Sequence, residues 1–150
     1  MTAKLQKKNI LLMIILTFFT FGIYTPVWFL NRKDIFNSMN SDDKISAGPI
    51  VFALSLFIIS AVLLFPSILF METEMENIID AINKILSIIG GVIILLMSFR
   101  VRRILEDHYK TELSSIATFF FLILYLQYEI NCFIDEEAET KKSGKINNTE

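Results

Sequence analysis

The apolar residues of this chain gather in four blocks instead of recurring at the spacing of a half-buried helix or strand. About 20 apolar residues in a helix cross a bilayer core of about 30 Å. Three blocks reach that length, and the block at 85–99 reaches it by including the more polar residues 78–84. The pattern predicts an all-α fold, a polytopic membrane helix bundle with four transmembrane helices. The blocks cover residues 10–30, 50–71, 85–99 and 113–134.

The first block contains an interruption, the stretch TFGIYTPVW at residues 20–28. Gly22 suits the left-handed conformation that commonly follows the end of a helix. Thr25 is a candidate N-cap, and Pro26 fits the first position of a new helix, where its missing N–H has no helical partner. We therefore expect one helix to end and another to begin here.

The helix after this break is predicted to be an interfacial amphipathic helix, lying in the plane of the membrane surface. It would run from Pro26 to about Asn40, with polar residues on most of its faces. Tyr24 and Trp28 would then belong to the aromatic belt at the membrane boundary. Two alternatives remain, a single kinked span and a re-entrant hairpin. The apolar face collects Trp28, Ile35, Phe36 and Met39.

The distribution of Lys and Arg leaves the orientation in the membrane open. With four spans, each side of the membrane carries seven of these residues, and the positive-inside rule counts only them. If the segment at 10–30 is re-entrant, the division becomes ten against four. We prefer four spans with both termini in the cytoplasm.

Residues 1–134 are predicted to form a single membrane-embedded helical domain, and the polar residues 135–150 to form a disordered tail. The formal net charge is −2, with 14 Lys and Arg against 16 Asp and Glu. This balance gives no reason to expect a nucleic-acid partner. Cys132 is the only cysteine, so the chain can form no internal disulfide and no thiolate metal cluster.

Two stretches of the chain carry a resemblance to a known family. They are TFGIYTPVWFLNRKDIFNSMN at residues 20–40 and RRILEDHYKTELSSIATFFFLILYLQYEIN at residues 102–131. Both resemble the small multi-pass membrane proteins grouped as domain of unknown function 4234. The resemblance implies a membrane location and a small helical fold, and it brings no assigned activity, cofactor or catalytic residue. Its most specific residues are Gly22, Ile23, Tyr24 and Trp28 in the first stretch, and Tyr125, Leu126, Gln127, Tyr128, Ile130 and Asn131 in the second.

The chain also contains a short repeated spacing, which we call the internal echo. The spacing Thr-Phe-Phe-x4-Tyr occurs from Thr17 to Tyr24 and again from Thr118 to Tyr125. Inverted repeats are found in membrane transporters. Four matched residues in a Phe-rich chain are nevertheless better attributed to coincidence.

Glu129, with Gln127 and Asn131 beside it, is the strongest ionisable candidate inside an apolar block. Such residues are functional candidates because each one is costly unless it is paired. One interpretation is a proton or cation site, and the one we favour is a structural intramembrane ion pair. Antiparallel packing of the third and fourth spans would place Lys84 opposite Glu129. In the same register, the interface between the third and fourth spans consists of small or polar residues, which let helices pack closely. These helix-packing residues are Ser87, Gly91, Ser98 and Ser115.

The third span ends in the basic sequence FRVRR. Arg100, Arg102 and Arg103 are candidates for contact with a lipid headgroup, or they simply anchor the span at that level. Two acidic residues, Glu106 and Asp107, follow at a spacing of four and would neutralise the cluster.

No sequence motif supports catalysis. The chain has no Gly-rich phosphate loop, no CxxC and no HExxH, so we expect no enzyme activity, no cofactor and no metal. We predict an integral, multi-pass protein of the cell membrane, acting as a small interaction, scaffold or regulatory component. Its partners would be the lipid bilayer and either another membrane protein or a second copy of the chain. The alternatives are an oligomeric channel or ion-coupled transporter using Glu129, and a membrane-embedded enzyme acting on lipid.

Overall fold

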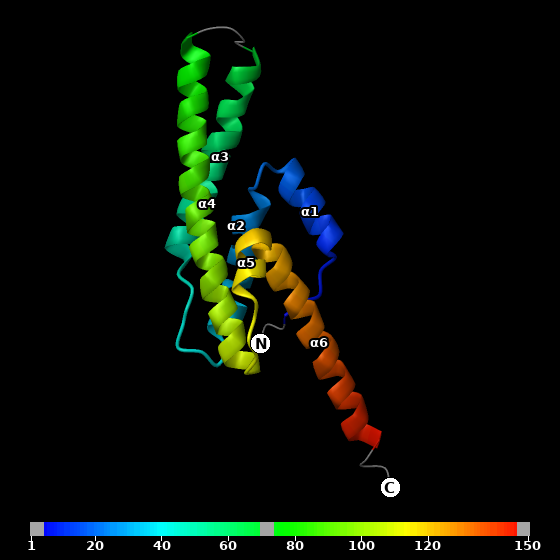
Figure 1. Ribbon diagram of the computed structural model, residues 1–150. Coiled ribbons are helices and arrows are strands. Elements are labelled where there is room, and N and C mark those ends of the chain that lie inside the picture. The colour runs from blue at the N-terminus through cyan, green and yellow to red at the C-terminus, as the bar shows by residue number, and fades with distance from the viewer. Residues whose placement is uncertain (1–4, 70–73, 147–150) are drawn as a thin grey trace.

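The described residues fold into six α-helices arranged as three helical hairpins (Figure 1). The computed structural model describes residues 5–69 and 74–146, and the side chains of residues 5–64 and 77–140. This part of the chain contains no β-strand, which confirms the all-α prediction. The helices are α1 (Ile10–Phe19), α2 (Tyr24–Asn37), α3 (Ala47–Leu69), α4 (Glu74–Tyr109), α5 (Ser115–Phe121) and α6 (Ile123–Ile146).

The three hairpins point the same way. α3 and α4 pack against each other and extend well beyond the other two hairpins (Figure 1). The turn between α1 and α2 and the turn between α5 and α6 face the same end of the molecule as the tip of this long hairpin. The connections at residues 38–46 and 110–114 lie toward the opposite end.

Two of the described helices are long and apolar enough to cross a membrane. These spans are Ala47–Leu64 in α3 and Asn77–Tyr109 in α4, and only 22% of the apolar window in each is buried. The first and last apolar blocks contain shorter helices separated by breaks. The four full-length spans predicted from the sequence are therefore not confirmed.

The break in the first block lies where the sequence predicts it. Gly22 has the left-handed backbone conformation, with φ 86°, and α2 begins at Tyr24. Thr25 is not the N-cap, however, because it lies inside α2, whose N-cap residue is Ile23. The Thr20 hydroxyl accepts a hydrogen bond from the Tyr24 N–H at 3.0 Å. Pro26 is the third residue of α2 and still lies in the first turn, where proline is tolerated.

A second break, at Leu122, separates α5 from α6, and no glycine in the sequence predicts it. Leu122 has φ 45°, and Phe21 in the first break has φ 49°. Each residue lies four positions after the threonine of a Thr-Phe-Phe sequence, Thr17 in one case and Thr118 in the other. Positive φ is uncommon for residues other than glycine. The echo attributed to coincidence thus marks two similar backbone breaks.

α2 is a core helix rather than an interfacial one. It packs against α1, α3 and α4, and the side chains of Trp28, Phe29 and Phe36 are buried. The predicted position of Trp28 in an aromatic belt is therefore wrong, because the apolar face of α2 is covered by other helices. Tyr24 is partly buried at the start of the same helix.

The main contact of α4 is with α3, whereas the sequence predicts packing against the last apolar block. The Ser60 hydroxyl on α3 lies 3.2 Å from the Ser87 hydroxyl on α4, and the ring of Phe57 packs against Gly90. Ser87 is thus a packing residue, but it faces α3. Ser98 is buried, and its hydroxyl donates to a carbonyl one turn earlier in α4 at 2.9 Å.

The tail is helical where the sequence predicts disorder. α6 continues to Ile146, and residues 147–150 lie outside the described part of the chain. The segment EEAETKK consists mostly of good helix formers. It also places Glu137 four residues before Lys141, a spacing that stabilises a helix. Its polar composition therefore indicates a solvated helix.

We expect Gly90→Val to destabilise the α3–α4 hairpin and Gly91→Val to be tolerated. A Cβ atom at Gly90 would lie 3.2 Å from Phe57 Cε2, whereas a Cβ atom at Gly91 would meet no atom within 4 Å. Gly91, predicted to pack against the last apolar block, is therefore not a close-packing position, and the close contact is that of Gly90 with α3. Overpacking costs about 1–3 kcal/mol. Thermal unfolding under identical conditions measures the difference, and equal midpoints would contradict the Phe57 contact.

Gly22→Val should destabilise the protein more than Pro26→Ala. Gly22 combines φ 86° with a position where a Cβ atom would lie 3.2 Å from Phe57 Cε1. A β-branched residue is strained in that conformation, whereas Ala at position 26 keeps the first turn of α2 intact. Denaturant unfolding of both variants tests this order, and a greater loss for Pro26→Ala would show that the turn does not depend on Gly22.

Candidate functional site

A cluster of buried polar side chains joins α2 to α6. Arg32, on α2, is 4% exposed, and Gln127, on α6, is fully buried. The guanidinium carbon of Arg32 lies 4.7 Å from the centre of the Trp28 ring. Tyr24, Trp28 and Arg32 follow one another at intervals of four residues, so they share one face of α2. The face predicted to hold aromatic anchors thus also holds a buried cation.

The side-chain amide of Gln127 is bonded at both of its ends. Its Oε1 atom accepts hydrogen bonds from Arg32 Nη2 at 2.7 Å and from Trp28 Nε1 at 3.1 Å. Its Nε2 atom donates to Asn131 Oδ1 at 2.8 Å and to the Gln6 carbonyl at 3.2 Å. Gln127 therefore connects α2, α6 and the segment before α1.

Asn131, one turn further along α6, holds the segment before α1 in place. Its Nδ2 atom donates to the Lys8 carbonyl at 2.9 Å, and its Oδ1 atom accepts from the Lys8 N–H at 3.2 Å. These two bonds engage both backbone polar groups of Lys8, as a neighbouring strand would. The position of Lys8 is therefore set by the same network that orients Arg32.

Arg32 has no acidic partner among the described residues. None of the ion pairs in this part of the chain includes it, and its Nε atom is buried without a hydrogen-bond partner. A guanidinium has five N–H donors, and the bond to Gln127 uses one of them. Burying a charge without a counter-ion costs several kcal/mol. The cluster is therefore chemically suited to receive an anion.

Lys8 adds a second positive charge near Arg32. Burial lowers the pKa of the Lys8 ammonium, and the charge of Arg32 lowers that pKa further. The adjacent Lys7 is paired with Asp135, whereas Lys8 forms no ion pair with any described residue. Arg32 and Lys8 therefore both lack a carboxylate partner among the described residues.

The two stretches that carry the family resemblance meet in this cluster. Tyr24 and Trp28 belong to the first stretch, and Gln127 and Asn131 belong to the second. A family model described as a domain of unknown function, DUF4234, matches residues 8–136. The chain belongs to this family.

Membership of the DUF4234 family confirms the resemblance and assigns no activity. The matched residues begin at Lys8 and include Arg32, Gln127 and Asn131, so they contain the charged part of the cluster. No curated protein and no solved structure matches the chain.

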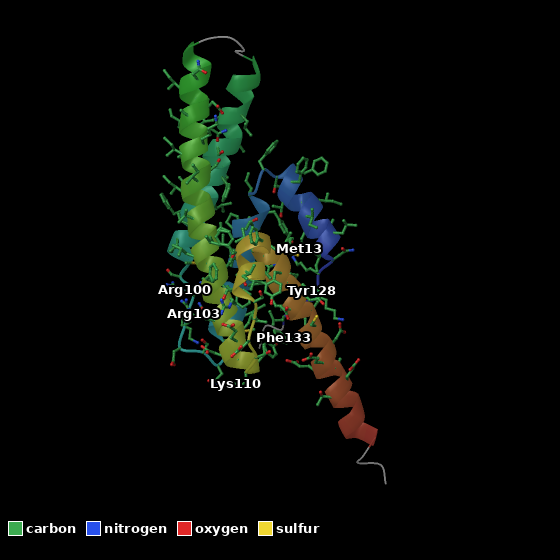
Figure 2. All side chains as sticks on the ribbon, in the orientation of Figure 1. Met13, Arg100, Arg103, Lys110, Tyr128 and Phe133 are labelled. Carbon is green, nitrogen blue, oxygen red and sulfur yellow. The ribbon has the colours of Figure 1, made fainter. Side chains whose placement is uncertain are left out.

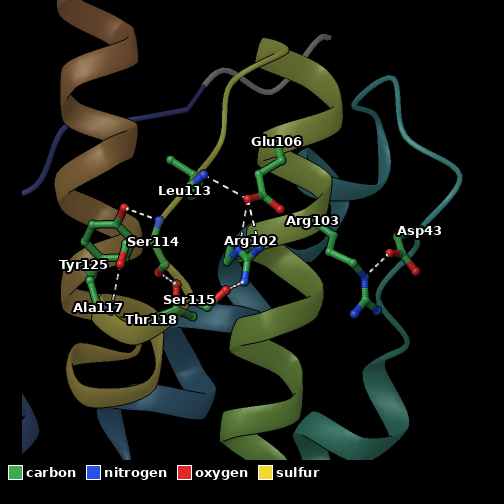
Figure 3. Close-up of polar contacts among 10 residues, drawn as sticks. All are labelled: Asp43, Arg102, Arg103, Glu106, Leu113, Ser114, Ser115, Ala117, Thr118 and Tyr125. Atoms are coloured by element: carbon green, nitrogen blue, oxygen red, sulfur yellow. Dashed lines mark hydrogen bonds and ion pairs between the residues drawn. The ribbon is translucent and has the colours of Figure 1, made fainter.

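Arg102 holds the connection between α4 and α5 (Figure 3). Its Nε and Nη2 atoms each lie 3.0 Å from Glu106 Oε1. The same oxygen accepts a hydrogen bond from the Leu113 N–H at 2.8 Å, and Arg102 Nη1 donates to the Ser115 hydroxyl. Glu106 therefore neutralises Arg102 as expected, and Ser115, predicted to pack between two spans, instead holds the start of α5.

The other two arginines of the basic sequence differ in their partners. Arg103 Nε donates to Asp43 Oδ2 at 2.6 Å, which links α4 to the loop before α3 (Figure 3). Arg100 forms no ion pair within the described residues, and its charge contributes to lowering the pKa of Asp43. Figure 2 shows Arg100, Arg103 and Lys110 away from the tip of the α3–α4 hairpin, toward its opposite end.

The predicted ion pair between Lys84 and Glu129 does not form. The side chain of Lys84 is 72% exposed and pairs with Asp80 on its own helix, at 2.6 Å. Glu129 forms no ion pair with any described residue. The half of α4 that carries Lys84 packs along α3, and α6 lies toward the other half (Figure 1). The predicted register is therefore wrong.

Arg32 is the candidate residue that reasoning from the sequence missed. Its signal was present, because an arginine four residues after Trp28 falls on the aromatic face of the helix. Glu129 drew attention instead, although it lies two residues from Gln127 and from Asn131 and so points away from them. Among the described residues, no group of three or more His, Cys, Asp or Glu side chains is placed to hold a metal ion.

Gln127→Leu should destabilise the fold strongly, while Tyr128→Leu on the exposed face of the same helix should not. Leucine at position 127 removes the acceptor of both Arg32 Nη2 and Trp28 Nε1. A buried donor left without an acceptor costs about 1–3 kcal/mol, and more when it is charged. The free energy of unfolding measures both variants. Equal losses would mean that the network does not stabilise the contact between α2 and α6.

The ion pair between Asp43 and Arg103 predicts a pH-dependent stability. The hydrogen bond from Arg103 holds the pKa of Asp43 below its ordinary value of 3.8, partly opposed by burial and aided by the charges of Arg103 and Arg100. Because the folded-state pKa is the lower one, the stabilisation is complete above the ordinary pKa and is lost as the pH falls through the folded value. Asp43→Asn should therefore be less stable than the wild type at neutral pH, and the difference should shrink as the pH falls below the ordinary pKa of 3.8 and vanish once Asp43 is protonated in the folded state. Unfolding midpoints across this range test the prediction, and a difference that grows toward acid pH contradicts it.

Proposed function

We propose that this protein is an integral membrane protein in which α3 and α4 span the bilayer. The support is the apolar surface that this hairpin leaves uncovered. Large exposed apolar patches on soluble proteins promote association, whereas lipid chains cover such a surface without that penalty. The exposed side chains include Phe52, Ile58, Val62, Ile85, Ile88 and Leu96.

The two shorter hairpins are proposed to enter the bilayer from one side without crossing it. α1 has 10 residues, a length of about 15 Å, which is half of a bilayer core of about 30 Å. Aromatic side chains project near both turns, with Phe18 79% exposed and Phe120 71% exposed. Backbone breaks at membrane depth are tolerated where protein covers them, and the turn at Gly22 packs against Phe57.

This arrangement separates the basic residues almost completely. Of the 14 Lys and Arg residues, 13 would belong to the side that holds the termini and the loops at 38–46 and 110–114, and Lys84 alone to the other. Cytoplasmic segments of membrane proteins carry an excess of Lys and Arg, so we assign the basic side to the cytoplasm. The four-span arrangement, with seven on each side, has no such bias.

Within the membrane, the proposed role is that of a small interaction or scaffold component. A spanning hairpin with uncovered apolar surface and a basic cytoplasmic face offers contacts to another membrane protein or to a second copy of the chain. Glu129 lies outside the buried cluster, so we do not extend the proposal to ion transport. Purification in mild detergent at natural expression level should yield a stoichiometric partner or a homo-oligomer. A lone monomer would contradict the role.

Cysteine labelling tests the proposed topology. In a Cys132→Ala background, cysteines at Ser41 and Ser143 should react with a membrane-impermeant maleimide from the same side, and a cysteine at Glu74 from the opposite side. Four spans would instead place Ser143 and Glu74 together, opposite Ser41. Permeabilised membranes, in which all three positions should react, serve as the control. Labelling of Ser41 and Ser143 from opposite sides would rule out the pair of re-entrant hairpins.

A further inference from the structure

No described residue supplies a negative charge to the buried cluster around Arg32. The nearby acidic residues do not pair with Arg32: Asp34 lies 3.2 Å from Lys33, and Asp135 pairs with Lys7. Glu129, between Gln127 and Asn131 in sequence, forms no ion pair with any described residue. Arg32 is nevertheless 4% exposed, and its Nε atom has no partner. The described residues therefore leave the charge of Arg32 uncompensated, and an anion from outside this part of the chain would neutralise it.

The guanidinium is held in a fixed orientation. Gln127 binds Nη2 at 2.7 Å, and the Trp28 ring covers one face at 4.7 Å. The unused N–H donors of a guanidinium form a planar fork that matches two oxygens of a phosphate or carboxylate group. The backbone of Lys8 is bonded to Asn131, which accepts a hydrogen bond from Gln127, so the same network carries a second cation. A second cation favours a group with several anionic oxygens. These features together favour a phosphate group.

The surroundings indicate where such a phosphate would come from. Lys8 lies two residues before α1, at the point where the chain changes from polar to apolar. The side chains of Leu11, Leu12 and Ile15 on α1 are exposed. A lipid whose phosphate lies at Lys8 and Arg32 could therefore extend its acyl chains along α1.

We propose that Arg32 and Lys8 bind a phosphate group, supplied in the membrane by the headgroup of an anionic lipid, and that Gln127 and Trp28 hold the guanidinium in place. The choice of a lipid as the source of the phosphate rests on the proposed membrane location. The charge complementarity between the two cations and a phosphate does not rest on that location, because it depends only on the residues of the cluster. The lipid would neutralise Arg32 and tie the segment before α1 to α2.

Trp28, the only tryptophan of the chain, reports directly on this site. The full-length protein in neutral detergent is titrated with short-chain phosphatidylglycerol, with inorganic phosphate, and with a diacylglycerol of the same chains as a phosphate-free control. We expect phosphatidylglycerol to change Trp28 fluorescence saturably and to raise the unfolding midpoint, as a ligand specific for the folded state must. The diacylglycerol should do neither.

Three variants assign the effect to the site. Lys8→Gln, at a partly exposed position, should lower the apparent affinity severalfold, and Arg32→Gln should lower it by about tenfold or more, the loss expected for a charge-assisted hydrogen bond. Lys33→Gln, which removes a cation from the same helix but outside the cluster, should leave the affinity unchanged. If Arg32→Gln does not fold, the comparison of the affinities of Lys8→Gln and Lys33→Gln still tests the site.

Each outcome is decisive. Saturation by phosphatidylglycerol but not by inorganic phosphate assigns the site to a lipid headgroup, and equal saturation by both assigns it to a free phosphate ion. No saturable response, an equal response to diacylglycerol, or a loss in Lys33→Gln as large as in Lys8→Gln overturns the site. Because the titration is done in detergent, its failure is distinct from a contrary labelling result, which would overturn the topology alone.

Discussion

The side-chain amide of Gln127 is the group on which the contact between α2 and α6 depends. It accepts hydrogen bonds from Arg32 and Trp28, and it donates to Asn131 and to the Gln6 carbonyl. Three parts of the chain that are far apart in sequence are thereby joined through one buried residue. Buried polar networks are stabilising only when their members are satisfied together. The unpartnered Nε of Arg32 is where this network stays open.

The ring of Phe57 forms the second link, between the first backbone break and the long hairpin. Cβ atoms placed at Gly22 and at Gly90 would each lie 3.2 Å from it. The ring therefore packs at once against the turn between α1 and α2 and against α4, and at both places a Cβ atom would press on the ring. A backbone break that looks purely local in the sequence is in this way coupled to the packing of the long hairpin.

These two links suit the proposed arrangement, in which one hairpin spans the bilayer and the two shorter hairpins enter it from one side. The proposed spanning hairpin supplies the apolar surface, while the breaks at Gly22 and Leu122 return both shorter hairpins toward the basic end. Arg102 and Arg103 are tied to Ser115 and Asp43 there, so they brace the loops of that end. The proposed phosphate site would lie at the base of one hairpin. Its charge would be completed by the membrane rather than by the chain.

Local preferences allowed much to be determined from the sequence alone. The helical class, the two long apolar helices and the break at Gly22 follow from block length and from the conformation that glycine adopts most easily. Leu122 breaks its helix with no such signal, because leucine has no preference for its φ of 45°. The burial of α2, the pairing of α4 with α3 and the placement of Arg32 beside Gln127 were decided only by the tertiary structure. Each depends on which apolar faces meet, and that choice is made by contacts between residues far apart in the chain, which no local spacing records.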